Sequence, residues 1–377
     1  MRIAIFENIM TPGGHEVDFN RILSEELQRL GHEVVFYVPE DFVFALDYHT
    51  RVVRLRKQVV SYTNVKGLKR LWYTVRRERH RQSWYRQLYA AARAGEFDAL
   101  IIPTSTYRYL RALQHNVLRH SPVPVIFILH GINPGEAPKF LQAADNLRDC
   151  PNIRPTVLTF TDNIFGEKRP HIRTIYPPTF TPRDVDPAEF AQQPNDVLTI
   201  GFFGQYRREK HLEAFLDVYL QGHYTRPVKL LVQGATMHPE DAEDFERIIV
   251  KYQGKGIEFL HKGLIGAEWQ RAILSVDALL MPYSAPRYRY HWGGMLFTAI
   301  GYHKPVVASD DMNPEVFETY HIGETFRSGD MTDLRRALEH FINTYDATHY
   351  ADELDKASAA YAPEAFAARI EKILLTQ

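Results

Sequence analysis

The stretch 282–310 gathers residue types that can bind an anion. A run of aromatic and cationic side chains precedes the glycine pair Gly293 and Gly294; it consists of Arg287, Tyr288, Arg289, Tyr290, His291 and Trp292. A helix is predicted from Met295 onward, because apolar residues recur there at helical spacing. Glycines that open a helix leave backbone N–H groups at the positive end of its dipole, which suits a phosphate. Glycines that only form a tight turn would fit the same pattern.

A histidine occupies a second position whose side chain could bind or react with a ligand. The apolar run 124–131 predicts a buried strand, and His130 lies at its carboxyl end. Open α/β sheets bind their ligands at the carboxyl ends of parallel strands. His130 is therefore a candidate hydrogen-bond partner for a ligand, although a purely structural histidine would also fit there.

Residues 51–86 are strongly basic, with twelve Lys and Arg against the single acid Glu78. Aromatic residues lie between these cations, and 68–92 predicts a helix with an apolar side and a cationic side. Such a helix suits the interface of an anionic membrane. It would also suit the phosphates of an acceptor or, as a less favoured partner, of a nucleic acid. A solvated helix with aromatic residues in the core is the other interpretation.

Composition limits the class of protein. The chain has 377 residues, 45% hydrophobic and 24% charged, with a net charge of −1, which indicates a globular protein long enough for two domains. Cys150 is the only cysteine, so a reducing cytosol fits. The apolar run at the N-terminus is too short for a signal peptide, and no stretch reaches the length of a membrane span. We expect a cytoplasmic protein that associates at most with the inner face of a membrane.

The elements that must position these residues follow an alternating pattern. A strand at 2–6, a turn with Gly13 and Gly14, a helix at about 17–30 and a strand at 32–38 predict the opening of a doubly wound sheet. The three spaced glycines of a dinucleotide-binding turn are absent, so no nicotinamide cofactor is inferred. Further strands are predicted at 97–105, 124–131, 156–162 and 173–178.

The alternation restarts after a polar, proline-containing segment at 179–196, which we interpret as a linker. Strands are predicted at 198–204, 228–234, 257–263, 277–283 and 305–309, and helices at 331–345 and about 363–375. The predicted fold is α/β, with two doubly wound Rossmann-like domains that face each other across a cleft. The expected domains are 1–180, with the last helix (about 360–377) packed back on it, and 181–359. The cleft is the expected site.

Several motifs in this order resemble the nucleotide-sugar glycosyltransferases of the GT-B fold, and among them the retaining enzymes of family 4. The segment TPGGHEVDFNRILSEELQRLGHEVVFYVP is similar to the family's Gly-Gly turn, helix and strand. GFFGQYRREKHLEAFL resembles the turn that clamps the donor diphosphate. VDALLMPY and AIGYHKPVVASDDMNPEVF match the strand before the donor loop and the Gly-rich helix with its following strand.

The resemblance implies roles for particular residues. Lys210, with Arg208 or Arg207, would bind the donor diphosphate, helped by the N–H groups near Gly293 and Gly294 and by Arg287 and Arg289 as a second cation pair. His130 would contact the donor sugar, and Gly13 and Gly14 would approach the diphosphate or acceptor. The remaining implied donor-binding residues are Gln205, Gly234, Gly263, Leu264, Tyr290, His291, Trp292, Met295 and Thr298. The co-substrate would be a nucleoside-diphosphate sugar, with no metal and no other cofactor.

The chain departs from the family at three positions. The family's two glutamates, separated by seven residues, fall on Tyr290 and Thr298, and its clamp arginine falls on Gln205. A threonine can make one hydrogen bond at a time with a ribose but cannot bind two hydroxyls as a carboxylate does.

The resemblance therefore implies a divergent sugar transferase of glycan or glycolipid assembly. A second hypothesis is a catalytically inactive protein that binds a nucleotide or polyanion, and a third is a nucleotide-sugar epimerase.

Overall fold

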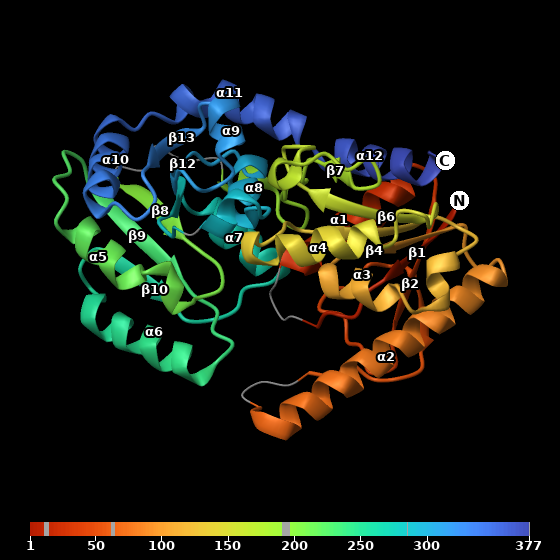
Figure 1. The fold of residues 1–377 in the computed structure, drawn as a ribbon. Coiled ribbons are helices and arrows are strands. Elements are labelled where there is room, and N and C mark those ends of the chain that lie inside the picture. Colours follow the sequence, from red (N-terminus) through yellow and green to blue (C-terminus); the bar gives the residue numbers. More distant parts are fainter. Residues whose placement is uncertain (11–14, 62–64, 191–196, 285, 377) are drawn as a thin grey trace. The chain divides into compact units, whose positions relative to one another are not determined.

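The computed structural model describes residues 1–10, 15–61, 65–190, 197–284 and 286–376 (Figure 1). The chain divides into two compact units. The first unit is Met1–Pro177 with Pro363–Gln377, and the second is Pro178–Ala362. Each unit has a parallel sheet covered by helices, so the predicted α/β class with two doubly wound domains is confirmed.

The first unit contains a seven-stranded parallel sheet within its described residues, in the order β3-β2-β1-β4-β5-β6-β7. The strands are β1 (Arg2–Phe6), β2 (Glu33–Pro39), β3 (Arg51–Leu55), β4 (Ala99–Ile102), β5 (Val125–Leu129), β6 (Ile153–Leu158) and β7 (Arg173–Ile175). Every residue of β4 and β5 is buried, because helices cover both faces of the sheet.

Strand β3 was not expected, since its residues belong to the basic stretch 51–86. It lies at the edge of the sheet, pairs with β2 and buries only Leu55. An edge strand can carry Arg51 and Arg54 toward water, so its sequence lacks the apolar run that marks the central strands.

The helices of the first unit are α1 (His15–Arg29), α2 (Gly67–Arg93), α3 (Tyr107–Leu113), α4 (Ala137–Asp145) and α12 (Pro363–Leu375). The last helix packs on the first, and the ring centroids of Phe366 and Phe19 are 5.5 Å apart. His32 Nε2 lies 2.9 Å from Glu371 Oε1 beside this contact.

The second unit has a six-stranded parallel sheet in its described part, in the order β10-β9-β8-β11-β12-β13. The strands are β8 (Leu198–Phe202), β9 (Val228–Gln233), β10 (Ile257–Leu260), β11 (Ala278–Met281), β12 (Val306–Ser309) and β13 (Gly323–Phe326). The helices are α5 (Leu212–Leu220), α6 (Pro239–Tyr252), α7 (Gly266–Leu274), α8 (Gly294–Gly301), α9 (Pro314–Thr319), α10 (Met331–Thr344) and α11 (Ala347–Ala360).

The segment 179–196 was predicted as a linker, but its first part packs on the second unit. Thr179 N–H donates to the carbonyl oxygen of Tyr361 at 2.8 Å. Gln270 Oε1 accepts from the N–H groups of Arg183 and Asp184. Polar and proline-rich composition indicated a connection, but these backbone groups are ordered by hydrogen bonds that composition does not show.

Candidate functional site

The strand order of the second sheet reverses between β8 and β11. From β8 the chain moves outward through β9 and β10, and then returns to the other side of β8 with β11. Doubly wound sheets bind ligands outside the carboxyl ends of their strands at this kind of reversal. The loops that follow β8 and β11 are 203–211 and 282–293, and they hold most of the predicted site residues.

Lys210 is the buried cation at this reversal, with only 8% of its surface exposed. Its Nζ lies 4.7 Å from the ring centroid of Tyr283 and 5.5 Å from that of Phe202. The ring of Tyr283 lies 5.0 Å from that of Tyr288, and the Arg287 guanidinium lies 5.0 Å from the ring of Tyr288. Two tyrosine rings therefore connect the predicted cations Lys210 and Arg287 across the two loops.

The Tyr283 phenol does not cancel the positive charge of this cluster. Burial raises the pKa of the Tyr283 phenol well above its usual range, so the phenol stays protonated at neutral pH. Arg287 also donates to the hydroxyl oxygen of Tyr288 at 3.1 Å. The result is an electropositive group of side chains suited to an anionic ligand.

Backbone pairing fixes the turn that carries Lys210. Gly204 has a φ of +111°, and its N–H donates to Gln233 Oε1 at 2.9 Å. Tyr206 N–H donates to the carbonyl oxygen of Ala235 at 2.8 Å, and Ala235 N–H donates to that of Gly204. The loop after β8 is thus joined to the loop after β9, with Gln205 in a bridge to Ala235.

The other two predicted cations of this turn make different contacts. Arg207 donates to Gln205 Oε1 at 3.0 Å. Arg208 donates to the carbonyl oxygen of Glu240 at 2.6 Å, and its Nε lies 3.9 Å from carboxylate oxygens of both Asp241 and Asp244. The structure therefore links Lys210 to Arg287 through two tyrosine rings, whereas Arg208 contacts the start of α6.

The glycine pair uses its own N–H groups inside the protein. Gly293 N–H donates to Asn313 Oδ1 at 3.0 Å, and Gly294 N–H donates to the carbonyl oxygen of Trp292 at 3.0 Å. A Cβ on Gly293 would lie 2.8 Å from Asn313 Oδ1, so the close approach requires glycine. These two N–H groups therefore do not face a ligand as expected. The N–H groups that meet no acceptor among the described residues are those of Met295 and Leu296, at the start of α8.

Some of the remaining predicted residues of the second unit make structural contacts, and the others lie at the surface. Thr298 is buried, and its hydroxyl donates to the carbonyl oxygen of Gly294 at 2.8 Å. The ring of Trp292 stacks on Phe180 with centroids 4.9 Å apart. Gly234 lies against Phe245, and Leu264 is buried. Wholly or partly at the surface lie Gly263, Arg289, Tyr290, His291 and Met295.

In the first unit the strand order reverses between β1 and β4, and Glu7 lies directly after β1. This carboxyl is 1% exposed, and its Oε1 accepts from the N–H groups of Asn8 and Ile9, each at 2.7 Å. Asn20 Nδ2 donates to Oε2 at 2.8 Å. Burial nevertheless raises the pKa of Glu7 to about 7, so this carboxyl changes charge near neutral pH.

His130 forms a chain of hydrogen bonds at the same edge of the first sheet. Its Nε2 lies 2.8 Å from the carbonyl oxygen of Pro103, which can only accept. A neutral His130 must then accept at Nδ1, and His15 Nε2 lies there at 2.8 Å as the donor. Both ring nitrogens of His130 are engaged within the protein. Gly13 and Gly14 lie outside the described residues.

A hollow of about 290 Å³ opens beside Glu7. Its walls are Ile9, Met10, Glu16, Val17, Asn20, Phe42, Val43, Phe44, Ala45 and Tyr48. Two buried oxygens on this wall, Glu16 Oε2 and Asn20 Oδ1, receive no hydrogen bond from the described residues. The hollow therefore has mainly apolar walls and two buried oxygens that can accept hydrogen bonds.

Four residues of these sites were not predicted from the sequence: Glu7, His15, Tyr283 and Asn313. An acid directly after a buried strand was the available signal for Glu7, because strand ends bind ligands in this fold class. No sequence signal connects Asn313 to Gly293, twenty positions earlier. In the described part of the chain, no group of three or more His, Cys, Asp or Glu side chains is placed to hold a metal ion.

Comparison with solved structures finds the same architecture over the whole chain. HepE from Anabaena, in complex with UDP-glucose, is 16% identical, with a TM-score of 0.67 and 99% of each chain covered. Sucrose-phosphate synthase from Thermosynechococcus elongatus is 16% identical, with a TM-score of 0.65 over 99% of this chain and 98% of that chain. WaaG, a glycosyltransferase involved in lipopolysaccharide biosynthesis, is 13% identical, with a TM-score of 0.64 over all of both chains. The chain has the GT-B fold.

The GT-B fold was predicted from the order of the motifs, and the structural likeness confirms it. No protein-family model matches the sequence, and no curated protein sequence matches it. One fold can carry many different activities, so the function of this chain depends on the site residues described above.

Proposed function

We propose that the protein is a glycosyltransferase that moves a sugar from a nucleoside-diphosphate sugar to an acceptor. The observation that carries this proposal is the cluster of Lys210, Tyr283, Tyr288 and Arg287 at the strand-order reversal of the second unit. Structures of HepE hold UDP and UDP-glucose, which supports a donor of the same class here. The product would be a glycan or a glycolipid.

In the proposed reaction, the bond between the anomeric carbon and the diphosphate oxygen breaks, and the oxygen leaves with the electron pair. The acceptor oxygen bonds to the same carbon with retention, and its proton passes to the departing phosphate. Lys210 and Arg287 would stabilise the negative charge that grows on the diphosphate, together with the N–H groups of Met295 and Leu296. These groups would supply the positive charge that a metal ion supplies in metal-dependent enzymes.

The donor sugar and ribose would be held differently from the family pattern. Thr298 is buried and already bonded to the carbonyl oxygen of Gly294, and Tyr290 replaces the other carboxylate. The donor would be bound mainly by Lys210, Arg287 and the start of α8.

The sugar acceptor would bind on the first unit. The hollow beside Glu7 has apolar walls and two hydrogen-bond acceptors, Glu16 Oε2 and Asn20 Oδ1. An acceptor with an apolar portion and more than one hydroxyl group would satisfy both features, because each buried oxygen lacks a donor among the described residues. A glycolipid or a hydrophobic alcohol fits this description.

The donor proposal predicts the effect of Lys210→Ala on nucleotide binding. Calorimetric titration with UDP, GDP and ADP identifies the preferred nucleotide, and Lys210→Ala should weaken its binding by about tenfold to a hundredfold. This factor corresponds to loss of a hydrogen bond to a charged group.

Lys229→Ala is the matched control, since Lys229 lies on β9 of the same unit and is paired with Glu258 at 3.8 Å. Equal affinity of the Lys210→Ala and wild-type proteins would refute the assignment of Lys210.

Turnover separates a transferase from a nucleotide-binding protein. Release of free nucleotide from the bound nucleotide-sugar, with and without candidate acceptors, measures transfer and hydrolysis. Tight nucleotide binding without release from any sugar donor would favour the inactive binding protein, which the replacement of both carboxylates makes the second candidate.

A further inference from the structure

Helix α2 has two halves with different surroundings. Its buried residues are Arg81, Trp84, Tyr85, Leu88, Ala91 and Ala92, all in the second half. Trp84 Nε1 donates to the carbonyl oxygen of Lys57 at 3.1 Å, and Tyr85 packs edge-on against Phe127 of the central sheet. The second half is therefore anchored, and the residues from Gly67 to Arg79 are exposed or only partly buried, at the free end of α2 in Figure 1.

The exposed half carries an apolar stripe. Leu68, Leu71, Trp72 and Val75 are 85%, 60%, 56% and 42% exposed, respectively. Their spacing of three, four and seven positions places them on one side of the helix. Large apolar side chains grouped in this way on a surface mark an interaction site, because each is more stable out of water.

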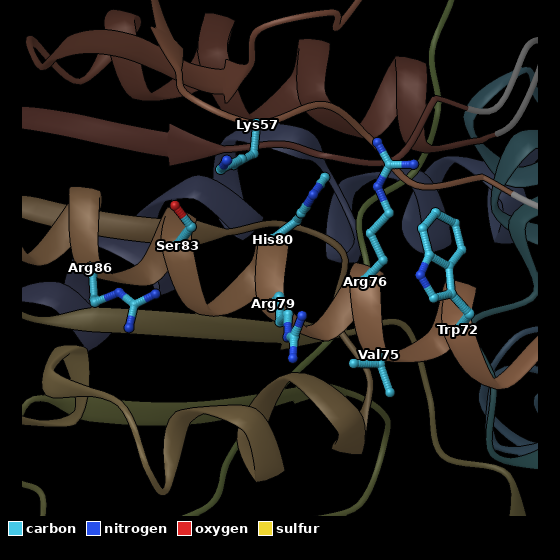
Figure 2. Close-up of a pocket in the computed structure, with 8 residues that line it drawn as sticks. All are labelled: Lys57, Trp72, Val75, Arg76, Arg79, His80, Ser83 and Arg86. Carbon is cyan, nitrogen blue, oxygen red and sulfur yellow. The ribbon is translucent and has the colours of Figure 1, made fainter.

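Cations border the stripe. A hollow of about 430 Å³ is lined by Lys57, Trp72, Val75, Arg76, Arg79, His80, Ser83 and Arg86 (Figure 2). Figure 2 shows the three arginines along one helix and Lys57 on the neighbouring loop. Arg76 lies 5.3 Å from the ring centroid of Trp72, so charge and apolar surface adjoin.

The single acid of this region does not offset these charges. Glu78 Oε2 accepts from Arg81 at 2.7 Å, and Arg81 is buried in the anchored half. The N-cap residue Lys66 makes no side-chain cap, and the first turn of the helix holds no acid. Cations near a helix N-terminus oppose the dipole, so negative charge beside this end of α2 would stabilise it.

An anionic membrane fits these features better than a nucleic acid does. Phosphates of either partner would satisfy Lys57, Arg76, Arg79 and Arg86. Sites for single-stranded nucleic acid use aromatic rings on which bases stack, whereas three of the four stripe residues are aliphatic. Leucine, valine and tryptophan beside cations are the composition of helices that lie in the interface of a bilayer.

We propose that the first half of α2 docks on a bilayer with anionic headgroups. The stripe of Leu68, Leu71, Trp72 and Val75 enters the boundary of headgroups and acyl chains, and Arg76, Arg79 and Arg86 with Lys57 contact lipid phosphates. This inference goes beyond the proposed function, because it concerns where the protein resides and not what it transfers. None of the helices among the described residues has the length and apolar character of a membrane span.

Vesicle sedimentation of the full-length protein tests the proposal. Phosphatidylcholine vesicles with 30% phosphatidylglycerol should bind the protein at 50 mM salt, and pure phosphatidylcholine vesicles should bind it at least tenfold more weakly. High salt should weaken binding, because each cation near an anionic surface contributes an interaction that ions screen.

Two variants separate the apolar and the charged contributions. Leu71→Ser/Trp72→Ser should lower partitioning onto anionic vesicles about tenfold or more, and Arg76→Glu/Arg79→Glu should abolish the preference for anionic lipid. The control Arg148→Glu/Lys168→Glu changes the same charge at exposed positions of the same unit and should bind like the wild type. Circular dichroism verifies that each variant is folded.

Tryptophan emission reports insertion directly. Vesicle binding should shift the emission to shorter wavelength, and Trp72→Phe should bind vesicles without this shift. Equal binding to neutral and anionic vesicles, or no binding to either, would overturn the proposal. So would binding that Leu71→Ser/Trp72→Ser leaves intact and that single-stranded DNA displaces, since that result identifies a polyanion site.

Discussion

At the scale of single residues, Glu7 is where burial and hydrogen bonding oppose each other. Three N–H donors around the carboxylate favour its charged form, and complete removal from water favours the neutral form. Burial is the larger effect, so the pKa rises from an ordinary value of 4.5 to about 7. A carboxyl at the end of β1 can therefore exchange a proton near neutral pH.

Glu7→Gln should remove a pH-dependent loss of stability. Below about pH 4.5 the carboxyl is protonated in both the folded and the unfolded state. Between about 4.5 and 7 the unfolded state ionises first, so this group's contribution to stability falls as pH rises, by on the order of 3 kcal/mol in total. Glutamine keeps the shape without the charge, and Asn20 can turn its amide to accept from it.

The measurement is the free energy of unfolding by urea at several pH values from 4.5 to 8. As pH rises, the free energy of unfolding of the wild type should fall relative to that of Glu7→Gln. A difference that is constant over this range would contradict the raised pKa.

At the scale of elements, the turn before α8 depends on one buried asparagine. Asn313 is 2% exposed and has a φ of +43°. Its Oδ1 accepts from Gly293 N–H, and its Nδ2 donates to the carbonyl oxygen of His291 at 2.9 Å. The start of α9 thereby holds the loop that carries Arg287, so loop and helix behave as one structural element.

Gly293→Ala should disturb this turn and weaken nucleotide binding. The added Cβ would lie 2.7 Å from Met312 Sδ and 2.8 Å from Asn313 Oδ1, which forces the buried asparagine to move. We expect a loss of stability of about 1–3 kcal/mol. Calorimetric titration with the preferred nucleotide should show weaker binding.

Gly135→Ala is the matched control, because a Cβ there meets no atom within 4 Å. Its unfolding free energy should stay within about 0.5 kcal/mol of the wild type. A Gly293→Ala protein as stable as this control would refute the tight packing of the turn.

At the scale of the whole molecule, the two units differ in how the chain builds them. The second unit is one continuous segment, Pro178–Ala362. The first unit needs both ends of the chain, because α12 packs on α1 and Arg154 donates to the carbonyl oxygen of Ile373. Only the second unit can be cut out as one continuous segment.

A fragment of residues 178–362 should therefore fold and bind the nucleotide, whereas residues 1–177 alone should not fold stably. Removal of α12 leaves Phe19 and the face of α1 exposed to water, which costs hydrophobic burial. Circular dichroism and urea unfolding check both fragments, and calorimetry checks nucleotide binding by the fragment 178–362. A cooperative unfolding transition in 1–177 would contradict the role of α12.

Apolar runs in the sequence predicted most of the strands, because parallel strands covered on both faces must be apolar along their length. The same rule failed for β3 and β13. The edge strand β3 carries Arg51 and Arg54, and β13 consists of only Gly323–Phe326 with two partly buried polar residues. Motif order predicted the GT-B fold because glycine turns and buried strands recur at characteristic spacing.

The sequence by itself determined the fold class, the position of Lys210 and the Arg287–Gly294 run in loops at strand ends, and the basic character of α2. These features depend on residue type and local spacing. Only the tertiary structure decided that Arg287 joins Lys210 through two tyrosine rings, that Asn313 takes up the N–H of Gly293, and that Glu7 is buried. Charge, burial and hydrogen-bond partners depend on residues distant along the chain, so the stretch 282–310 supplies candidates and the packed second unit selects among them.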